Sequence, residues 1–140
     1  MEMEIKKSFN WSMGHRLMKH KGLCYNPHGH NYKIDLCIYG ELNEDGMVMD
    51  FSEVKKQMKP IIDELDHCFI ISTSDGTLVD MFEGSDFKIV AVPFETTAEN
   101  LVIWLYDRIK KETDIPIRKL ELFETDGNSA RHTGFLTVKK

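Results

Sequence analysis

The sequence predicts an α+β domain in which helices cover one face of an antiparallel sheet. Two observations carry this prediction. Apolar residues alternate with polar ones near both ends of the chain, as in half-buried strands, and they recur at helical spacing in two segments between them. The chain has 140 residues, the size of one domain, and contains no internal repeat or low-complexity linker. We therefore expect a single domain over residues 1–140.

The first two strands are expected at residues 2–12 and 30–41. The second shows the clearer alternation, because four large apolar side chains fall on one face: Tyr32, Ile34, Leu36 and Ile38. The run Asn43-Glu44-Asp45-Gly46 then ends the alternating pattern with turn-forming residues.

A first helix is expected from Asp50 or Ser52 onwards, where the spacing of apolar residues changes to the helical period. Its buried stripe comprises Phe51, Val54, Met58, Ile61, Ile62 and Leu65. Pro60 lies inside this stretch and is expected to kink or interrupt the helix, because proline lacks the backbone N–H that the helix uses.

The second half of the chain repeats the order of strand and helix. Residues 88–93 form a short apolar run ending in proline, which is expected to be an edge strand. Thr96 and Glu99 fit a capping box, which places the start of a second helix just before Ala98. The buried face of this helix is expected to comprise Leu101, Trp104, Leu105 and Ile109.

The last two strands are expected at residues 117–124 and 135–138, joined by Asp126-Gly127-Asn128-Ser129. An open antiparallel sheet exposes strand edges unless subunits pair across them. We therefore expect an oligomer.

Composition and charge narrow the classes of function. The formal net charge is −5, and no lysine and arginine stripe with interleaved aromatics is present, which argues against nucleic acid or an anionic membrane as a partner. No stretch approaches the length of a membrane span, and the amino terminus lacks the apolar run of a signal peptide. The three cysteines are irregularly spaced and do not resemble a disulfide framework, so we expect a cytoplasmic protein with reduced thiols.

Two histidines, His28 and His30, are separated by one glycine where an alternating segment begins. Alternate side chains of a strand point to the same face, so both imidazoles share one face. His15 ends the first expected strand and offers a third imidazole. Three nitrogen ligands with an open fourth position are the arrangement of catalytic zinc.

Two other interpretations of these histidines remain open at this point. A histidine pair at a strand edge can be solvated without binding a metal. Alternatively, Cys24 can join His28, His30 and one further ligand in a closed structural zinc site. The two zinc interpretations differ in whether the thiol binds the metal or stays free to react, and the spacing does not decide between them.

Asp66, His67 and Glu124 are further candidates for chemistry. An aspartate that is hydrogen-bonded to an imidazole fixes its tautomer and raises its basicity, which suits proton transfer. The alternative for His67 is a histidine favoured at a helix carboxyl end by the macrodipole. Glu124 ends the strand 117–124 and is either a solvated carboxylate or, if buried, one that needs donors such as two adjacent N–H groups of a heterocycle.

Six short segments make the chain resemble the 6-pyruvoyl-tetrahydropterin synthase family, which includes the bacterial 6-carboxytetrahydropterin synthases of the queuosine pathway. They occur in the family's order and extend over nearly the whole chain. The segments are Phe9…His15-Arg16-Leu17, Cys24…His28-Gly29-His30, Gly46-Met47-Val48-Met49-Asp50-Phe51, Leu65-Asp66-His67, Thr97-Ala98-Glu99-Asn100-Leu101 and Glu124-Thr125. Each segment is weakly specific alone, whereas six in order are a strong signal.

The resemblance implies the tunnelling fold, a four-stranded antiparallel sheet with two helices on one face, assembled into an oligomeric barrel of trimers that pair as homohexamers. It also implies a Zn²⁺ ion on three histidines, a catalytic thiol, a proton-transfer pair and a carboxylate that anchors the pterin ring. In this sequence the resemblance assigns the metal to His15, His28 and His30, and the catalytic thiol to Cys24. It assigns proton transfer to Asp66 and His67, and the ring anchor to Glu124.

The substrate implied by the resemblance is 7,8-dihydroneopterin triphosphate. The carboxy branch of the family forms 6-carboxy-5,6,7,8-tetrahydropterin and releases acetaldehyde and triphosphate, whereas the pyruvoyl branch releases triphosphate only. A noncatalytic pterin- or purine-binding member is a further alternative. A folate-type subgroup carries glutamate at the position of Tyr25, so Tyr25 together with Cys24 argues against that subgroup. The short chain favours the carboxy branch.

The sequence departs from the usual family pattern at three places near the expected site. Met13-Gly14 replaces the common Ala-Ala, Phe94-Glu95 replaces Asn-Pro, and residues 72–93 lengthen the link between the helices. These departures leave the expected ligand set intact and bear on specificity for the substrate side chain.

Overall fold

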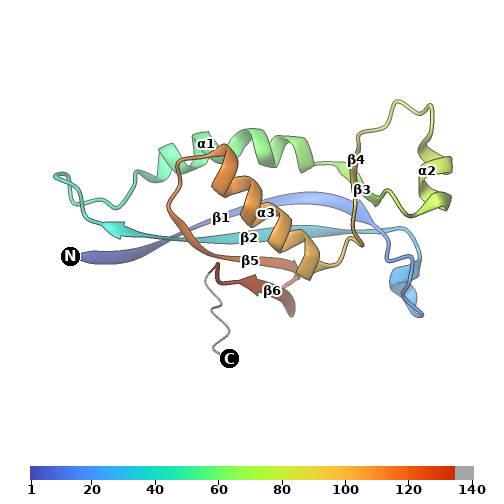
Figure 1. Cartoon of the computed structure of the whole chain (residues 1–140), viewed down its shortest axis with the longest axis horizontal. Coiled ribbons are helices and arrows are strands. Elements are labelled where there is room, and N and C mark those ends of the chain that lie inside the picture. Colours follow the sequence, from blue (N-terminus) through green and yellow to red (C-terminus); the bar gives the residue numbers. More distant parts are fainter. Residues whose placement is uncertain (135–140) are drawn as a thin grey trace.

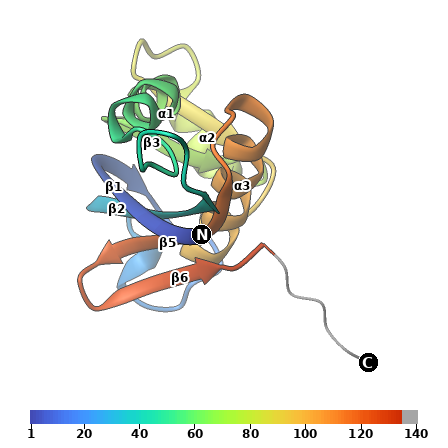
Figure 2. The ribbon, with the colours of Figure 1, turned by 90° about the vertical axis from the view of Figure 1, so that its left-hand side faces the viewer.

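The computed structural model describes residues 1–134, which form one six-stranded sheet with helices over one face (Figure 1). In chain order the elements are β1 (Glu2–His15), the short 3-10 helix η1 (Leu23–Tyr25), β2 (His28–Glu41), α1 (Phe51–Leu65), β3 (Cys68–Ser72), α2 (Gly76–Phe82), β4 (Ile89–Val92), α3 (Ala98–Glu112), β5 (Ile117–Thr125) and β6 (Asn128–His132). Figure 2 looks along the strands and shows α1 and α3 on the same side of the sheet.

The expected α+β class with an antiparallel sheet is confirmed, and the six-stranded sheet is larger than the four strands implied by the family resemblance. Its strand order is β4-β3-β1-β2-β5-β6. The strands β1, β2, β5 and β6 are the antiparallel part. The strands β3 and β4 extend it on the β1 side by parallel pairing. The lengthened link between the long helices therefore adds to the sheet.

The core lies between the sheet and the two long helices. The four apolar residues predicted to share a face of β2 are fully buried: Tyr32, Ile34, Leu36 and Ile38. Facing them are the buried residues of α1 and α3, namely Val54, Met58, Ile61, Leu65, Ala98, Leu101, Val102, Leu105, Tyr106 and Ile109. Each large apolar side chain stabilises the fold by about 1.5–3 kcal/mol when fully buried. This packing fixes which face of the sheet carries the site.

The expectation that Pro60 interrupts the first helix is wrong, because α1 runs without a break from Phe51 to Leu65. Pro60 removes the hydrogen bond that would otherwise end on the Lys56 carbonyl. Both residues are exposed, so water is available to that carbonyl. The helix therefore continues through a proline that lies on its solvent side.

The helix α3 starts at Ala98 as predicted, but its capping residue is Thr97. The Thr97 hydroxyl accepts a hydrogen bond from the Asn100 backbone N–H at 3.1 Å. Thr96, which the sequence pattern assigned to the cap, is buried and contacts other groups.

The last hairpin is shifted relative to the prediction. The strand β5 is confirmed at Ile117–Thr125, but β6 begins at Asn128, so Asn128 and Ser129 belong to a strand and not to the turn. Asp126-Gly127 alone makes the connection, and a two-residue turn is enough for a hairpin. The expected strand at 135–138 lies outside the described residues.

The helix α2 was not expected from the sequence. Asp75 caps it by accepting a hydrogen bond from the Leu78 N–H at 3.3 Å. Before it, β3 pairs with β1 in parallel at Met13↔Cys68 and Gly14↔Phe69. A Cβ atom on Gly14 would lie 2.7 Å from a ring carbon of Phe69, so this close approach requires glycine.

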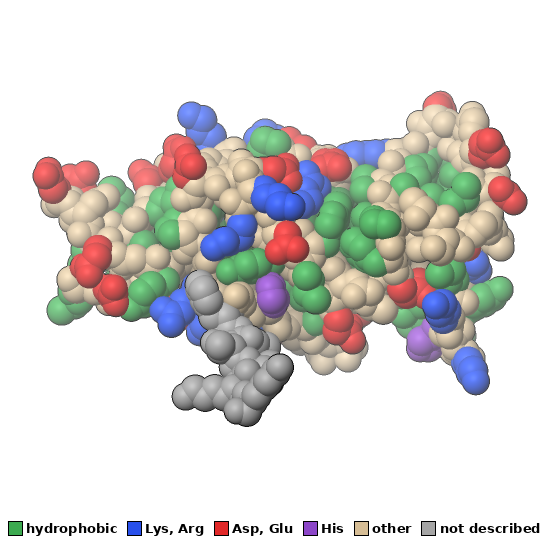
Figure 3. Space-filling view, in the orientation of Figure 1, with side chains coloured by type: hydrophobic (Ala, Val, Ile, Leu, Met, Phe, Trp, Pro, Cys, Tyr) green, Lys and Arg blue, Asp and Glu red, His purple; other side chains and the backbone are tan. Residues whose placement is uncertain are grey.

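Acidic and basic side chains are interspersed over the face that carries α1 and α3, without a basic stripe there (Figure 3). This distribution agrees with the formal net charge of −5. Within residues 1–134, none of the helices combines the length and apolar character needed to cross a membrane.

Candidate active site

The β1–β2 pair brings the three predicted histidines together. His15 ends β1 and lies opposite His28, the first residue of β2, while His30 lies opposite Met13. All three imidazoles are therefore on the face of the sheet that carries the core. One ligand atom from each lies within 4.8 Å of the other two, which is close enough to hold one metal ion.

Backbone carbonyls set the orientation of two of the three imidazoles. His15 Nδ1 lies 2.9 Å from the Thr96 carbonyl oxygen, and His28 Nδ1 lies 2.7 Å from the Asn26 carbonyl oxygen. Since a carbonyl oxygen only accepts, each Nδ1 carries the proton and each Nε2 presents a lone pair. The Nε2 atoms of His15, His28 and His30 are buried without a hydrogen-bond partner. Three orphaned lone pairs at one point fit a metal ion.

Thr96 is a site residue that the sequence analysis missed. Its hydroxyl lies 3.2 Å from His15 Nδ1 and donates to the Arg16 carbonyl oxygen at 3.2 Å. The doubled threonine Thr96-Thr97 is the available signal, because only one of the two can cap α3. The other is free to support the first metal-site histidine.

Glu124 joins the histidines from β5. Its Oε2 atom lies 3.4 Å from His15 Nε2 and 3.3 Å from His30 Nε2. When the imidazoles are protonated and no metal is bound, a long hydrogen bond from His15 and the charges of the three rings lower the pKa of Glu124 against the opposing effect of burial. Burial in turn lowers the pKa of His30. These separations are long for hydrogen bonds, so Glu124 keeps acceptor capacity for a ligand.

A cavity of about 460 Å³ opens next to Glu124. It is lined by Asn10, Gly29, His30, Asn31, Lys33, Phe123, Glu124, Thr125 and Asp126. A carboxylate and polar side chains around a concave space are suited to fixing the orientation of a small polar molecule.

Cys24 lies in η1, on the loop of residues 16–27 that connects the two histidine-bearing strands. Its thiol is free and half-buried. Among the described residues, the metal-ligating group consists of the three histidines and does not include Cys24. The geometry therefore favours a thiol that is available for chemistry over a closed structural zinc site.

Asp66 and His67 form a hydrogen-bonded pair at the end of α1. Asp66 Oδ1 lies 2.9 Å from His67 Nδ1 and accepts from the Ser12 N–H at 3.1 Å, while the His67 N–H donates to the Ser12 carbonyl at 2.7 Å. The hydrogen bond from the Ser12 backbone N–H is the main reason why the pKa of Asp66 is lowered. His67 has a φ of 65°, which is uncommon for a residue other than glycine. The pair is thus tied to the edge of β1.

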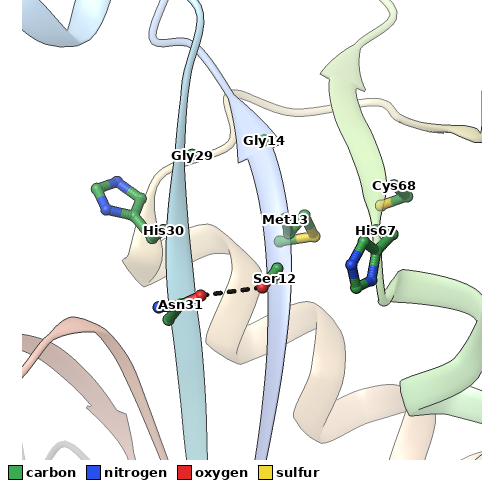
Figure 4. Close-up of a pocket in the computed structure, with 8 residues that line it drawn as sticks. All are labelled: Ser12, Met13, Gly14, Gly29, His30, Asn31, His67 and Cys68. Carbon is green, nitrogen blue, oxygen red and sulfur yellow. Dashed lines mark hydrogen bonds between the residues drawn. The ribbon is translucent and has the colours of Figure 1, made fainter.

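The Asp66–His67 pair does not lie beside the histidine cluster within one chain. His30 extends from β2 and His67 precedes β3, with β1 between them (Figure 4). Neighbouring strands are about 4.8 Å apart, so two strand spacings separate their backbones. His67 is largely exposed and lines a cavity of about 420 Å³ together with Ser12, Met13, Gly14, Gly29, His30, Asn31 and Cys68.

Comparison with known proteins identifies relatives of the whole chain. The family model described as 6-pyruvoyl tetrahydropterin synthase matches residues 4–134. A 6-carboxy-5,6,7,8-tetrahydropterin synthase of Haemophilus influenzae is 35% identical over 130 residues, covering 87% of this chain and 92% of the relative. The human 6-pyruvoyl tetrahydrobiopterin synthase is 30% identical over 148 residues, covering 95% and 92%.

Solved structures support the same fold. A protein of Wolinella succinogenes without an assigned function superimposes with a TM-score of 0.83 at 24% identity, covering 96% of this chain and 99% of the other. At this level of identity the match supports the fold alone.

We expect one divalent metal ion per chain, bound by the three orphaned Nε2 atoms. Because each imidazole supplies one of three ligands, His28→Ala and His30→Ala should each lose the metal, as measured by elemental analysis of the purified proteins. His20→Ala, which removes an imidazole outside the cluster, is the matched control. Full metal content in either of the first two variants would rule out the three-histidine site.

Proposed function

This chain belongs to the 6-pyruvoyl tetrahydropterin synthase family, and we propose that it is a zinc-dependent lyase acting on 7,8-dihydroneopterin triphosphate. The observation that carries the proposal is the convergence of three unpartnered imidazole nitrogens beside a carboxylate and a cavity. Three nitrogen ligands with an open fourth position are the preferred donor set of catalytic zinc. When bound there, zinc would supply a Lewis acid for the hydroxyls of the substrate side chain.

Cys24 is the proposed general base. It lies on the loop that joins the two strands of the metal site, and its thiol is free. In this role the thiolate form of Cys24 takes a proton from the substrate side chain as triphosphate leaves with the electrons of its carbon–oxygen bond. His67, with its tautomer held by Asp66, is the proposed acid/base on the opposite side of the side chain.

The position of His67 supports an oligomeric enzyme, which we propose to be a homohexamer formed as a dimer of trimers. The strand β3 pairs with β1 only at Met13 and Gly14, and Ser12 bonds Asp66 and His67, so within the described part of the chain no strand pairs with this edge of β1 before Met13. The exposed His67 lies at this edge. Pairing of subunits across this edge would bring His67 of one subunit to the metal site of its neighbour. There His67 would supply the second acid/base group of the site.

Glu124 is the proposed anchor of the pterin ring. It projects beside a cavity and lies close to two proposed zinc ligands, so a ring that it binds would hold its side chain near the metal. A carboxylate that accepts two adjacent N–H groups forms a bidentate, charge-assisted pair. Ring recognition and chemistry would then share one face of the sheet.

We propose the carboxy branch, in which carbon–carbon cleavage follows elimination of triphosphate and the products are 6-carboxy-5,6,7,8-tetrahydropterin and acetaldehyde, in queuosine biosynthesis. The similarity to a 6-carboxy-5,6,7,8-tetrahydropterin synthase supports this branch. The similarity to a 6-pyruvoyl tetrahydrobiopterin synthase keeps the pyruvoyl branch as the second candidate. A cytoplasmic location remains a proposal based on the irregular spacing of the cysteines.

Replacement of Cys24 by alanine should abolish most turnover while the metal remains bound. General-base catalysis typically contributes about 10²-fold or more to the rate, so product formation should fall by that factor. The measurement combines steady-state product formation with elemental analysis. Cys37→Ala, which removes a thiol from the middle of β2, is the control and should remain active. Loss of zinc together with folding in Cys24→Ala would instead indicate a structural zinc ligand.

Replacement of Glu124 by glutamine should weaken pterin binding, because the amide offers one acceptor and places a donor against a ring donor. The expected loss is roughly 1.5–3 kcal/mol, the scale of a hydrogen bond to a charged group. Direct titration with neopterin measures it, with zinc content checked in parallel. Glu121→Gln on the other face of β5 is the matched control. Unchanged affinity would remove Glu124 from the ring site, and loss of zinc would make it a metal ligand.

The purified enzyme should release acetaldehyde in step with the consumption of 7,8-dihydroneopterin triphosphate. A coupled alcohol dehydrogenase assay follows the aldehyde, and mass spectrometry identifies the pterin product. Complete consumption without acetaldehyde, together with a pyruvoyl-pterin product, would move the protein to the pyruvoyl branch. Binding without any consumption would indicate a noncatalytic member.

A further inference from the structure

We propose that the buried ion pair between Arg16 and Asp75 is a positioning clamp that holds in one conformation the loop of residues 16–27, and with it Cys24, between the strand ends that carry His15 and His28. The inference rests on the proposed function in that Cys24 is taken as the base. It assigns a role to the lengthened link between the helices, because Asp75 belongs to that link.

The Arg16–Asp75 pair has the geometry of a strong, directional contact. Arg16 is 8% exposed and Asp75 is 3% exposed. Arg16 Nε donates to Asp75 Oδ2 at 2.6 Å, and Nη2 donates to Oδ1 at 2.6 Å. A bidentate pair of this kind fixes the guanidinium in one plane. Loss of one partner would leave the other charge buried and uncompensated, so the surrounding chain would have to move to hydrate it.

Two contacts carry the fixed position of Arg16 to Cys24. The Arg16 guanidinium carbon lies 4.7 Å from the centre of the Tyr25 ring, so the two groups stack. Tyr25 directly follows Cys24 in the chain. On the other side, the N–H of Leu17 donates to the Cys24 carbonyl at 2.8 Å. Cys24 is thus held through its own carbonyl and through the next side chain, and both contacts start from Arg16 or its neighbour.

The segment directly after the link, Glu95 and Thr96, contacts the loop at a second point. The Glu95 carboxylate lies 3.4 Å from the Met18 N–H and 3.2 Å from the Lys19 N–H. Thr96, directly after it, holds both the Arg16 carbonyl and the His15 ring. Asp75 near the beginning of the link and two residues just beyond its end therefore hold the loop that follows His15. Arg16 is not a metal ligand, so in this proposal its effect on the reaction passes through the position of Cys24, and unchanged zinc content distinguishes that route from an effect on the neighbouring His15.

The variant Asp75→Asn removes the ion pair with Arg16 but keeps the cap of α2. Asparagine is as good a helix cap as aspartate, so α2 keeps its first hydrogen bond while the charge and one acceptor for Arg16 are lost. In the zinc-loaded enzyme we expect the backbone amides of Leu17 and Tyr25 to exchange with deuterium about tenfold faster or more, as for a locally opened segment. We expect kcat to fall by about 10²-fold, the scale of a misplaced catalytic group, with KM and zinc content nearly unchanged.

Glu64→Gln is the matched control. It removes a carboxylate that pairs with Arg108 at 2.6 Å, a more exposed ion pair between α1 and α3 that does not touch the loop and leaves Arg108 paired with Glu112. We expect it to leave the exchange of the loop amides and kcat unchanged. The double variant Arg16→Met with Asp75→Asn removes both charges and guards against misfolding of the single variant; it should show the same faster exchange and the same loss of kcat.

Unchanged exchange of the loop amides in a folded variant would overturn the proposal. Faster exchange with an unchanged kcat would also overturn it, because the pair would then only stabilise the fold. If the wild-type enzyme does not turn over the pterin, the proposed function fails separately. Hydrogen exchange and the rate at which iodoacetamide alkylates Cys24, measured by peptide mapping, then test the clamp. Both rates should differ between Asp75→Asn and the wild type.

Discussion

The register of β1 against β2 is the constraint on which the rest of the structure depends. The two strands pair along their full length, from Glu2↔Glu41 to His15↔His28. Side chains alternate between faces, so a slip of one residue would turn one strand's apolar set to solvent and separate its histidines from the others. The buried Tyr32 and Ile34 oppose such a slip, because their face is covered by the two long helices. Hydrophobic burial therefore also sets the spacing of the proposed metal ligands.

Much of this arrangement was predictable from the sequence, because it depends on local periodicity. The strand positions of His28 and His30, the start of α3 and the pairing of Asp66 with His67 all follow from short-range patterns. What the sequence left undetermined depends on distant contacts. Thr96 supports the ring of His15, which is far away in the chain. The strand β6 is polar, so its sequence shows no recognisable alternation. The continuation of α1 through Pro60 was not predictable, because the local pattern does not show that the Lys56 carbonyl is open to water.

The site combines rigid and exposed parts in a way that suits a shared active site. Backbone carbonyls hold the imidazoles of His15 and His28, and their ligand atoms are buried. The Asp66–His67 pair instead lies at an exposed edge, where Ser12 holds it by two backbone hydrogen bonds. Preorganised groups that are held by backbone contacts lose little conformational entropy when a ligand arrives. Each half of the proposed chemistry is thus prepared before the halves meet.

The close approach of Gly14 and Phe69 constrains how this sequence can change over time. The aromatic ring occupies the space that a methyl group on residue 14 would need. An alanine at position 14 would therefore require the partly exposed Phe69 ring to move. Substitutions at positions 14 and 69 should not have additive effects on stability, because the two residues share one space. The added parallel strand thus couples the residue next to a proposed metal ligand to a residue far along the chain.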